Sequence, residues 1–145
     1  MTMQLVFGEL FYNQPREGTG RVLTSDSFIV RSGNVPACVN HWRDNDRVLS
    51  CPAMWAAGGT GLMISHILDD RIEYERLLLE KVARQELFWS YGDGAHPEVT
   101  RLAIAGDVRQ IPYKVKPLAS VHIGHVSYVA QPAFYQEPIR WVGVN

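Results

Sequence analysis

The sequence predicts a single α+β domain over residues 1–145, in which a mostly antiparallel sheet packs against one long helix and one short helix. Apolar residues make up 46% of the chain and charged residues 20%, which is typical of a globular protein. Runs rich in β-branched and aromatic residues lie toward both ends, and a helix-like period fills the middle. Strands, then helices, then strands again are typical of the α+β class.

Strands are expected first at residues 3–12 and 21–31, the second with a bend at Ser25-Asp26. The segment 32–36, SGNVP, carries turn residues and is expected to reverse the chain before a short strand in ACVNHW. The strongest strand pattern in the chain is ASVHIGHVSYVA, residues 119–130.

Residues 64–91 carry the pattern that predicts the long helix. Apolar side chains recur there near every 3.6 residues, at Ile64, Ile67, Leu68, Ile72, Leu78, Leu79, Val82 and Trp89. Tyr74 and Leu77 are apolar on the other side. An unbroken helix of about 28 residues would be about 42 Å long, so we expect a break near Ala83 or a partner that covers the second face. Residues 97–105, PEVTRLAIA, predict a short second helix that ends at Gly106.

The charge balance and hydropathy argue against nucleic-acid and membrane partners. The chain has 14 basic and 15 acidic residues and no basic cluster of the kind that nucleic-acid binding uses. No window approaches the roughly 20 apolar residues that span a bilayer. The first residues lack the basic region of a signal peptide, and two cysteines fit reduced thiols. We therefore expect a cytoplasmic protein, with leaderless export left open.

The stretch GGTG, residues 58–61, precedes the expected long helix. Glycines before a helix can present backbone N–H groups to an anion. A nucleotide-binding loop would also need a lysine in G-x-x-x-x-G-K-[ST], and this stretch has none. The sequence therefore favours an entry turn, with an incidental anion site as the functional alternative.

Four residues form a candidate zinc site: Cys38, His41, Cys51 and His66. Cys38 and His41 have C-x-x-H spacing, and four sulfur and nitrogen ligands can close a tetrahedral zinc site. The alternative is that both cysteines are structural core residues. His122 and His125 are not expected to share a metal, because residues three apart on a strand point to opposite faces.

A thiol hydrolase is a second alternative, with Cys51 as nucleophile and His125 as base. A catalytic cysteine needs a histidine that a third polar group orients, and Glu137 or Asn145 could supply that group. The word GHVSYV around His125 resembles the histidine strand of papain-like peptidoglycan hydrolases of the CHAP and NlpC/P60 type, in which the cysteine also precedes the histidine.

Residues 18–64 resemble the PAAR-repeat proteins, the small β-rich tips of type VI secretion and phage-tail spikes. The matching residues are Val22, Leu23, Thr24, Ser25, Gly33, Pro36, Ala37, Asp46, Val48, Cys51 and Pro52. The resemblance implies that Cys51 is a zinc ligand near an apex. The family's histidine after Cys-Pro is replaced by Ala53-Met54, so His41 and His66 would have to serve as ligands.

These patterns together predict a non-catalytic interaction or assembly protein with a protein partner or a homo-oligomeric state, which the resemblance extends to a PAAR-like component of a contractile injection or phage-tail system. No catalytic pattern stands out from its structural alternative, and the two-faced helix calls for a cover. The alternatives are the cysteine–histidine hydrolase and, third, a small-ligand-binding domain. No cofactor is expected beyond the candidate zinc ion, and whether the protein is an enzyme stays open.

Overall fold

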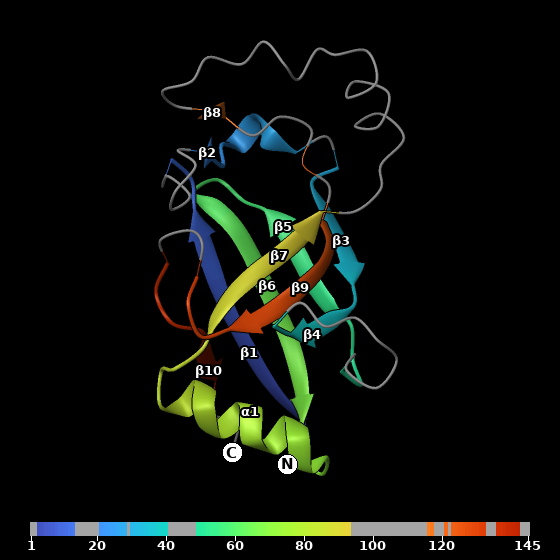
Figure 1. Ribbon diagram of the computed structural model, residues 1–145. Helices are drawn as coiled ribbons and strands as arrows, with labels where there is room; N and C mark the ends of the chain where they lie inside the picture. The colour runs from blue at the N-terminus through green and yellow to red at the C-terminus, as the bar shows by residue number, and fades with distance from the viewer. Residues whose placement is uncertain are drawn as a thin grey trace.

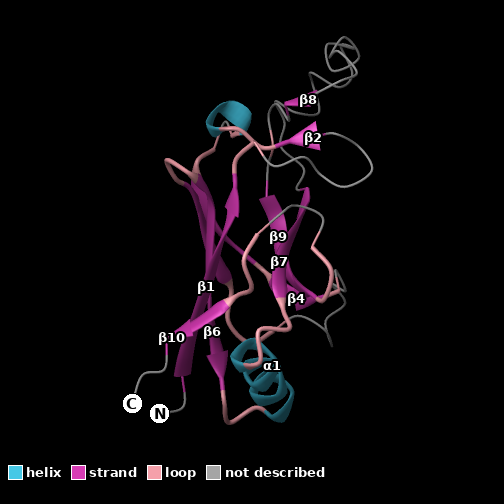
Figure 2. Cartoon of the chain, turned by 90° about the vertical axis from the view of Figure 1, so that its left-hand side faces the viewer, coloured by secondary structure: helices cyan, strands magenta, loops and turns pink. Residues whose placement is uncertain are grey.

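Two β-sheets face each other, and one helix lies across one end of them (Figures 1 and 2). The structure is a computed structural model. It describes residues 3–13, 21–28, 30–40, 49–93, 116–117, 121, 123–132 and 136–142.

The larger sheet has five antiparallel strands in the order β10-β1-β6-β5-β3. Their bounds are Met3–Phe11 for β1, Ser32–Val35 for β3, Ala53–Ala57 for β5, Gly61–Asp69 for β6 and Arg140–Val142 for β10. The longest ladder joins β1 to β6, with Met3 opposite Asp69 at one end and Phe11 opposite Gly61 at the other. The stretch GGTG forms the turn of the β5–β6 hairpin, so a strand and not a helix follows it.

The smaller sheet has the order β4-β9-β7, with β4 at Ala37–Val39, β7 at Phe88–Asp93 and β9 at Ile123–Val129. β4 pairs with β9 in parallel, and β7 pairs with β9 antiparallel. The chain passes from the larger sheet to the smaller one at Pro36, between β3 and β4. A short parallel pair, β2 (Arg21–Val22) with β8 (Lys116–Pro117), and a 3-10 turn at Ser25–Ser27 complete the described elements.

The hydrophobic core fills the space between the two sheets. Its fully buried members include Val6, Leu10, Leu62, Ile64 and Leu68 from the larger sheet and Trp89, Ile123, Val126 and Tyr128 from the smaller one. Trp89 packs directly over Gly8 of β1, where a Cβ would lie 2.9 Å from its Cδ1 atom. A glycine at position 8 therefore lets the two sheets approach each other at this point.

The helix α1, Glu73–Ala83, lies below the open end of the two sheets (Figure 2). Its inner side buries Leu78, Leu79 and Val82. Tyr74 and Leu77 on the other side are exposed. The helix ends at Ala83, where the sequence predicted a break or, alternatively, a partner over the second face. Within the described part of the chain, no helix has the length and apolar character that crossing a bilayer requires.

The predicted mostly antiparallel sheet is confirmed. One helix accompanies it among the described residues. The prediction of one long helix over 64–91 is wrong, because that stretch forms β6, α1 and β7. Residues 61–69 alternate between inward and outward positions in the ladder with β1. Apolar residues occupy both sets of positions, so the same residues also fit a helical stripe.

The other expected elements have mixed outcomes. The strands at 3–12 and 119–130 are confirmed as β1 and β9. The strand expected over 21–31 is reduced to β2 at Arg21–Val22, and the 3-10 turn at Ser25–Ser27 stands where the bend was expected. The expected turn at 32–36 is wrong, since Ser32–Val35 is strand β3 paired with β5. The short helix expected at 97–105 lies outside the described residues.

Candidate functional site

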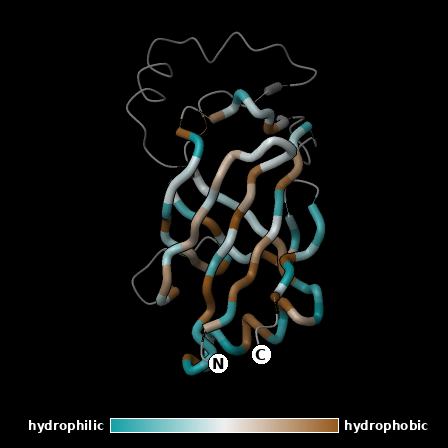
Figure 3. The backbone as a smooth tube through the Cα atoms, turned by 180° about the vertical axis from the view of Figure 1, so that it is seen from behind, coloured by the Kyte–Doolittle hydropathy of each residue, from teal (hydrophilic) through white to brown (hydrophobic). Residues whose placement is uncertain are grey.

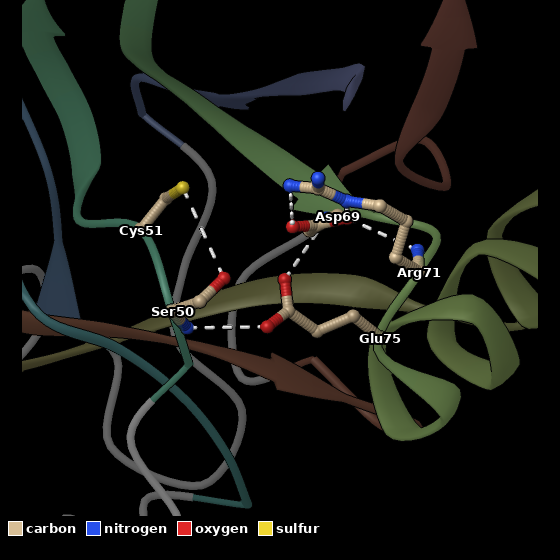
Figure 4. Close-up of polar contacts among 5 residues, drawn as sticks. All are labelled: Ser50, Cys51, Asp69, Arg71 and Glu75. Atoms are coloured by element: carbon tan, nitrogen blue, oxygen red, sulfur yellow. Dashed lines mark hydrogen bonds and ion pairs between the residues drawn. The ribbon is translucent and has the colours of Figure 1, made fainter. Parts of the chain in front are cut away.

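Cys51 lies in the short segment that leads into β5 and is partly buried. It borders a shallow depression of about 320 Å³ together with Pro36, Leu49 and Pro52. Its Sγ atom lies 3.9 Å from the hydroxyl oxygen of Ser50 (Figure 4). The thiol is therefore partly exposed and lies close to Pro36, where the chain passes from the larger sheet to the smaller one.

His66 fixes the backbone of Cys51 from inside the core. It is an inward-facing residue of β6, and its Nε2 atom lies 2.8 Å from the carbonyl oxygen of Cys51. Its Nδ1 atom lies 2.6 Å from the hydroxyl oxygen of Tyr128 on β9. A carbonyl only accepts hydrogen bonds, so Nε2 carries the proton and, in the neutral ring, Nδ1 accepts from the Tyr128 hydroxyl.

Burial sets the ionisation of this pair. Desolvation lowers the pKa of His66 below its ordinary value of 6.5, against a smaller opposing effect of the hydrogen bond to Cys51. Desolvation also raises the pKa of Tyr128 well above its ordinary value. Burial therefore favours the uncharged form of both side chains at neutral pH.

Glu75 connects the same segment to the helix. It is buried in the first turn of α1, where the helix dipole favours a carboxylate. Its carboxylate accepts hydrogen bonds from the backbone N–H of Ser50 at 3.2 Å and from that of Asp69 at 3.0 Å (Figure 4). One side chain thus holds together the start of β5, the end of β6 and α1.

Asp69 and Arg71 close the turn between β6 and α1. The Asp69 carboxylate accepts from the backbone N–H of Arg71 at 3.0 Å and from its guanidinium at 3.0 and 2.9 Å. These hydrogen bonds hold the pKa of Asp69 below its ordinary value.

We call His66, Tyr128, Glu75 and the backbone at 50–51 the polar clasp. The hydrogen bonds described above join these groups to one another or to the end of β6, which is the arrangement of a structural connection.

The structure places the candidate zinc ligands on different elements. Cys38 is buried in β4, and its thiol donates to the carbonyl of Val126 at 3.5 Å. Both ring nitrogens of His66 already have protein partners. His41 lies outside the described residues. Among the residues that are described, no three of His, Cys, Asp and Glu are grouped so that they could hold a metal ion.

The candidate catalytic residues are also separated. His125 and Tyr128 are three residues apart on β9, so their side chains leave opposite faces of that strand. Cys51 is connected to the Tyr128 side through His66, whereas the ring of His125 lies against Gly92 of β7. Glu137 is exposed and forms an ion pair with Arg140 at 2.6 Å. Asn145 and His122 lie outside the described residues.

A different feature stands out on the outside of the five-stranded sheet. The strand pairing puts the side chains of Met3, Leu5, Met54, Met63, Ile67 and Val142 on the face turned away from the core. Each exposes between 38% and 53% of its surface. We call these six residues the outer face. Figure 3 views the molecule from this side, where hydrophobic segments run along the strands.

The sequence patterns missed the outer face as a site, although a signal for it was present. A sheet with one side in solvent ordinarily alternates apolar and polar residues. In β1 the outward positions Met3, Leu5 and Phe7 are apolar, and in β6 the outward Met63 and Ile67 are apolar as well. Apolar residues at both the inward and the outward positions of a strand indicate a sheet that is covered on both sides.

Comparison of the chain with family models, with curated proteins and with solved structures found no match.

Proposed function

We propose that this protein is a non-catalytic interaction or assembly component that binds another protein surface through the outer face. The observation that carries the proposal is the set of large apolar side chains at neighbouring positions of β1, β5, β6 and β10, each about two-fifths exposed or more. Scattered surface hydrophobics are ordinary, but contiguous ones mark interaction sites.

Covering this face would release a substantial free energy. Complete burial of one such side chain is worth roughly 1.5–3 kcal/mol relative to full exposure. Covering the remaining two-fifths of six side chains would therefore contribute on the order of 5 kcal/mol, before the costs of association. Backbone and smaller side chains between them add contact area.

Photocross-linking in cells that make the protein tests the proposal. A photoreactive amino acid is placed at Met54 or Met63 of the outer face, and at Glu80, an exposed position on α1, as the control. We expect protein cross-links from positions 54 and 63 and few from position 80. Equal cross-linking at the three positions, or none at 54 and 63, would contradict the proposal.

The PAAR-like form of this proposal is supported by the sequence resemblance, which covers Gly33 on β3, Ala37 on β4 and Cys51 before β5. In that form the protein is a tip component of a contractile injection or phage-tail system that carries zinc at Cys51. Elemental analysis of the purified protein tests the metal directly, because a protein that contains no zinc is not a metal-bound tip.

The thiol-hydrolase alternative has one observation in its favour, the partly exposed thiol of Cys51 beside a surface depression. An activated thiolate reacts with iodoacetamide much faster than an ordinary thiol at neutral pH. An ordinary rate at Cys51, measured against a Cys51→Ser variant, would exclude this alternative.

A further inference from the structure

We infer that the partner of the outer face is a second copy of this chain, docked sheet against sheet about a two-fold axis. This inference rests on the proposed function and adds the identity of the partner. Three properties of the face support it: its low charge, its area and its self-complementary shape.

The charged side chains at outward positions of this sheet are largely neutralised within the chain. Asp69 is held by Arg71, and Arg140 is held by Glu137. Glu9, the third charged outward residue, accepts a hydrogen bond from the hydroxyl of Thr60 and keeps its charge. Each copy therefore brings one such carboxylate to the interface, so the repulsion between two copies is small, and the face offers few charges to a partner that binds through electrostatic complementarity.

The area of the face is at the lower limit of what a specific dimer needs. Nine-residue strands such as β1 and β6 are about 30 Å long, and five strands at about 4.8 Å spacing are about 24 Å wide. Because β3, β5 and β10 are only four, five and three residues long, the face measures on the order of 500 Å². Two copies would therefore bury about 1,000 Å² in total, which is the lower limit for a specific interface and fits a weak dimer.

The shape of the face is suited to pairing with itself. Met54, at 53%, is the most exposed of the large apolar side chains in the described part of the chain. Beside it lies a shallow depression of about 480 Å³, bordered by Phe7, Met63 and Ser65 among others. A two-fold interface requires a projection and a recess on the same surface. Methionine side chains adapt readily to such a contact, and two sheets stack about 10 Å apart.

Sedimentation equilibrium of the purified full chain, over a range of concentrations, tests the inference. We expect the unmodified protein to be a weak dimer with a dissociation constant of roughly 10–100 μM. Met54→Glu brings two like charges into the interface and should weaken the dimer by about 100-fold or more. Leu77→Glu makes the same type of change on the exposed side of α1 and should leave the dimer intact.

Two results would overturn the inference: a monomer at every concentration, or a dimer that Met54→Glu does not weaken. Met63→Glu provides a second variant, and thermal unfolding of each variant establishes that it is folded before its association is measured. If the protein is monomeric but positions 54 and 63 cross-link to a different protein in cells, the proposed function stands and the self-association falls. If it is monomeric and those positions cross-link to nothing, both fall.

Discussion

The two faces of the five-stranded sheet are built from similar residues and have different surroundings. On the inner face, Val6, Leu62 and Ile64 are almost completely buried against the smaller sheet. On the outer face, Met63 and Ile67 occupy the alternate positions of the same strand and remain more than one-third exposed. The difference teaches that residue type alone does not separate the core from the proposed interface in this sheet, because the position along the strand decides on which face a side chain lies.

The largest effect is expected on the inner face, from Leu62→Ala. This side chain is fully buried, so its truncation removes buried apolar area and leaves a cavity. We expect the free energy of unfolding to fall by about 3 kcal/mol, within the range of about 2–5 kcal/mol usual for such changes. Urea denaturation followed by circular dichroism measures it. A loss of less than about 1 kcal/mol would mean that the inner face is not close-packed at this point.

Glu75→Gln tests whether the polar clasp belongs energetically to the inner region. The carboxylate accepts two backbone N–H groups, and an amide presents one oxygen and one NH₂ group in its place. We expect a loss of about 2 kcal/mol, typical of a buried hydrogen bond to a charged group. Glu73→Gln is the matched control, since Glu73 lies on the same turn and is exposed. Equal losses from the two variants would contradict the role given to Glu75.

His66→Gln is expected to cost about 1 kcal/mol at neutral pH, through loss of the hydrogen bonds to Tyr128 and Cys51. The pH dependence gives a sharper test. The pKa of His66 is lower in the folded chain than its ordinary 6.5, so the unfolded chain binds the proton first as the pH falls. The stabilisation is therefore present above about pH 6.5 and decreases below it.

The measurement compares the slope of unfolding free energy against pH in the unmodified protein and in His66→Gln. The slope between about pH 5 and 6.5 should be smaller in the variant. Asp69 does not interfere, because its pKa lies below 3.8 and its contribution is lost only in more acidic solution. Identical slopes would show that His66 is not held neutral by burial.

The smallest effect on folding is expected on the outer face. Met63 follows Leu62 directly on β6 but faces away from the core, and the variant is Met63→Ser. At concentrations low enough for the chain to be monomeric, we expect the free energy of unfolding to change by less than about 0.5 kcal/mol. The same denaturation experiment measures it. A loss comparable to that of Leu62→Ala would remove the distinction between the two faces.

The sequence predicts much of the sheet because β1 and β9 are rich in apolar, β-branched and aromatic residues. It misassigns residues 64–72 for a physical reason that the comparison of the two faces explains. An ordinary half-exposed strand would carry polar residues where β6 carries Met63 and Ile67. With apolar residues at those positions, Ile64, Ile67 and Leu68 fit the helical spacing as well as the strand spacing.

The candidate site was less predictable than the fold. Cys51 and His66 were singled out as possible ligands, and they do come together, but through a carbonyl oxygen and a ring nitrogen instead of through a metal. Glu75 had no distinguishing signal, because its neighbours Glu73 and Glu80 look the same in the sequence and lie exposed. Which of several carboxylates becomes buried depends on the distant segment at residues 50–51, and residue spacing carries no information on that contact.

The pairing of β1 with β6 also bears on how the chain reaches this fold. The paired residues are separated by between 50 positions, from Phe11 to Gly61, and 66 positions, from Met3 to Asp69. The β5–β6 hairpin is local and can form early, whereas β1 must wait for a distant partner, which slows folding. During that interval β6 presents apolar side chains on both sides and an unpaired edge, the combination that promotes aggregation. Slower synthesis at lower temperature should therefore raise the yield of folded protein.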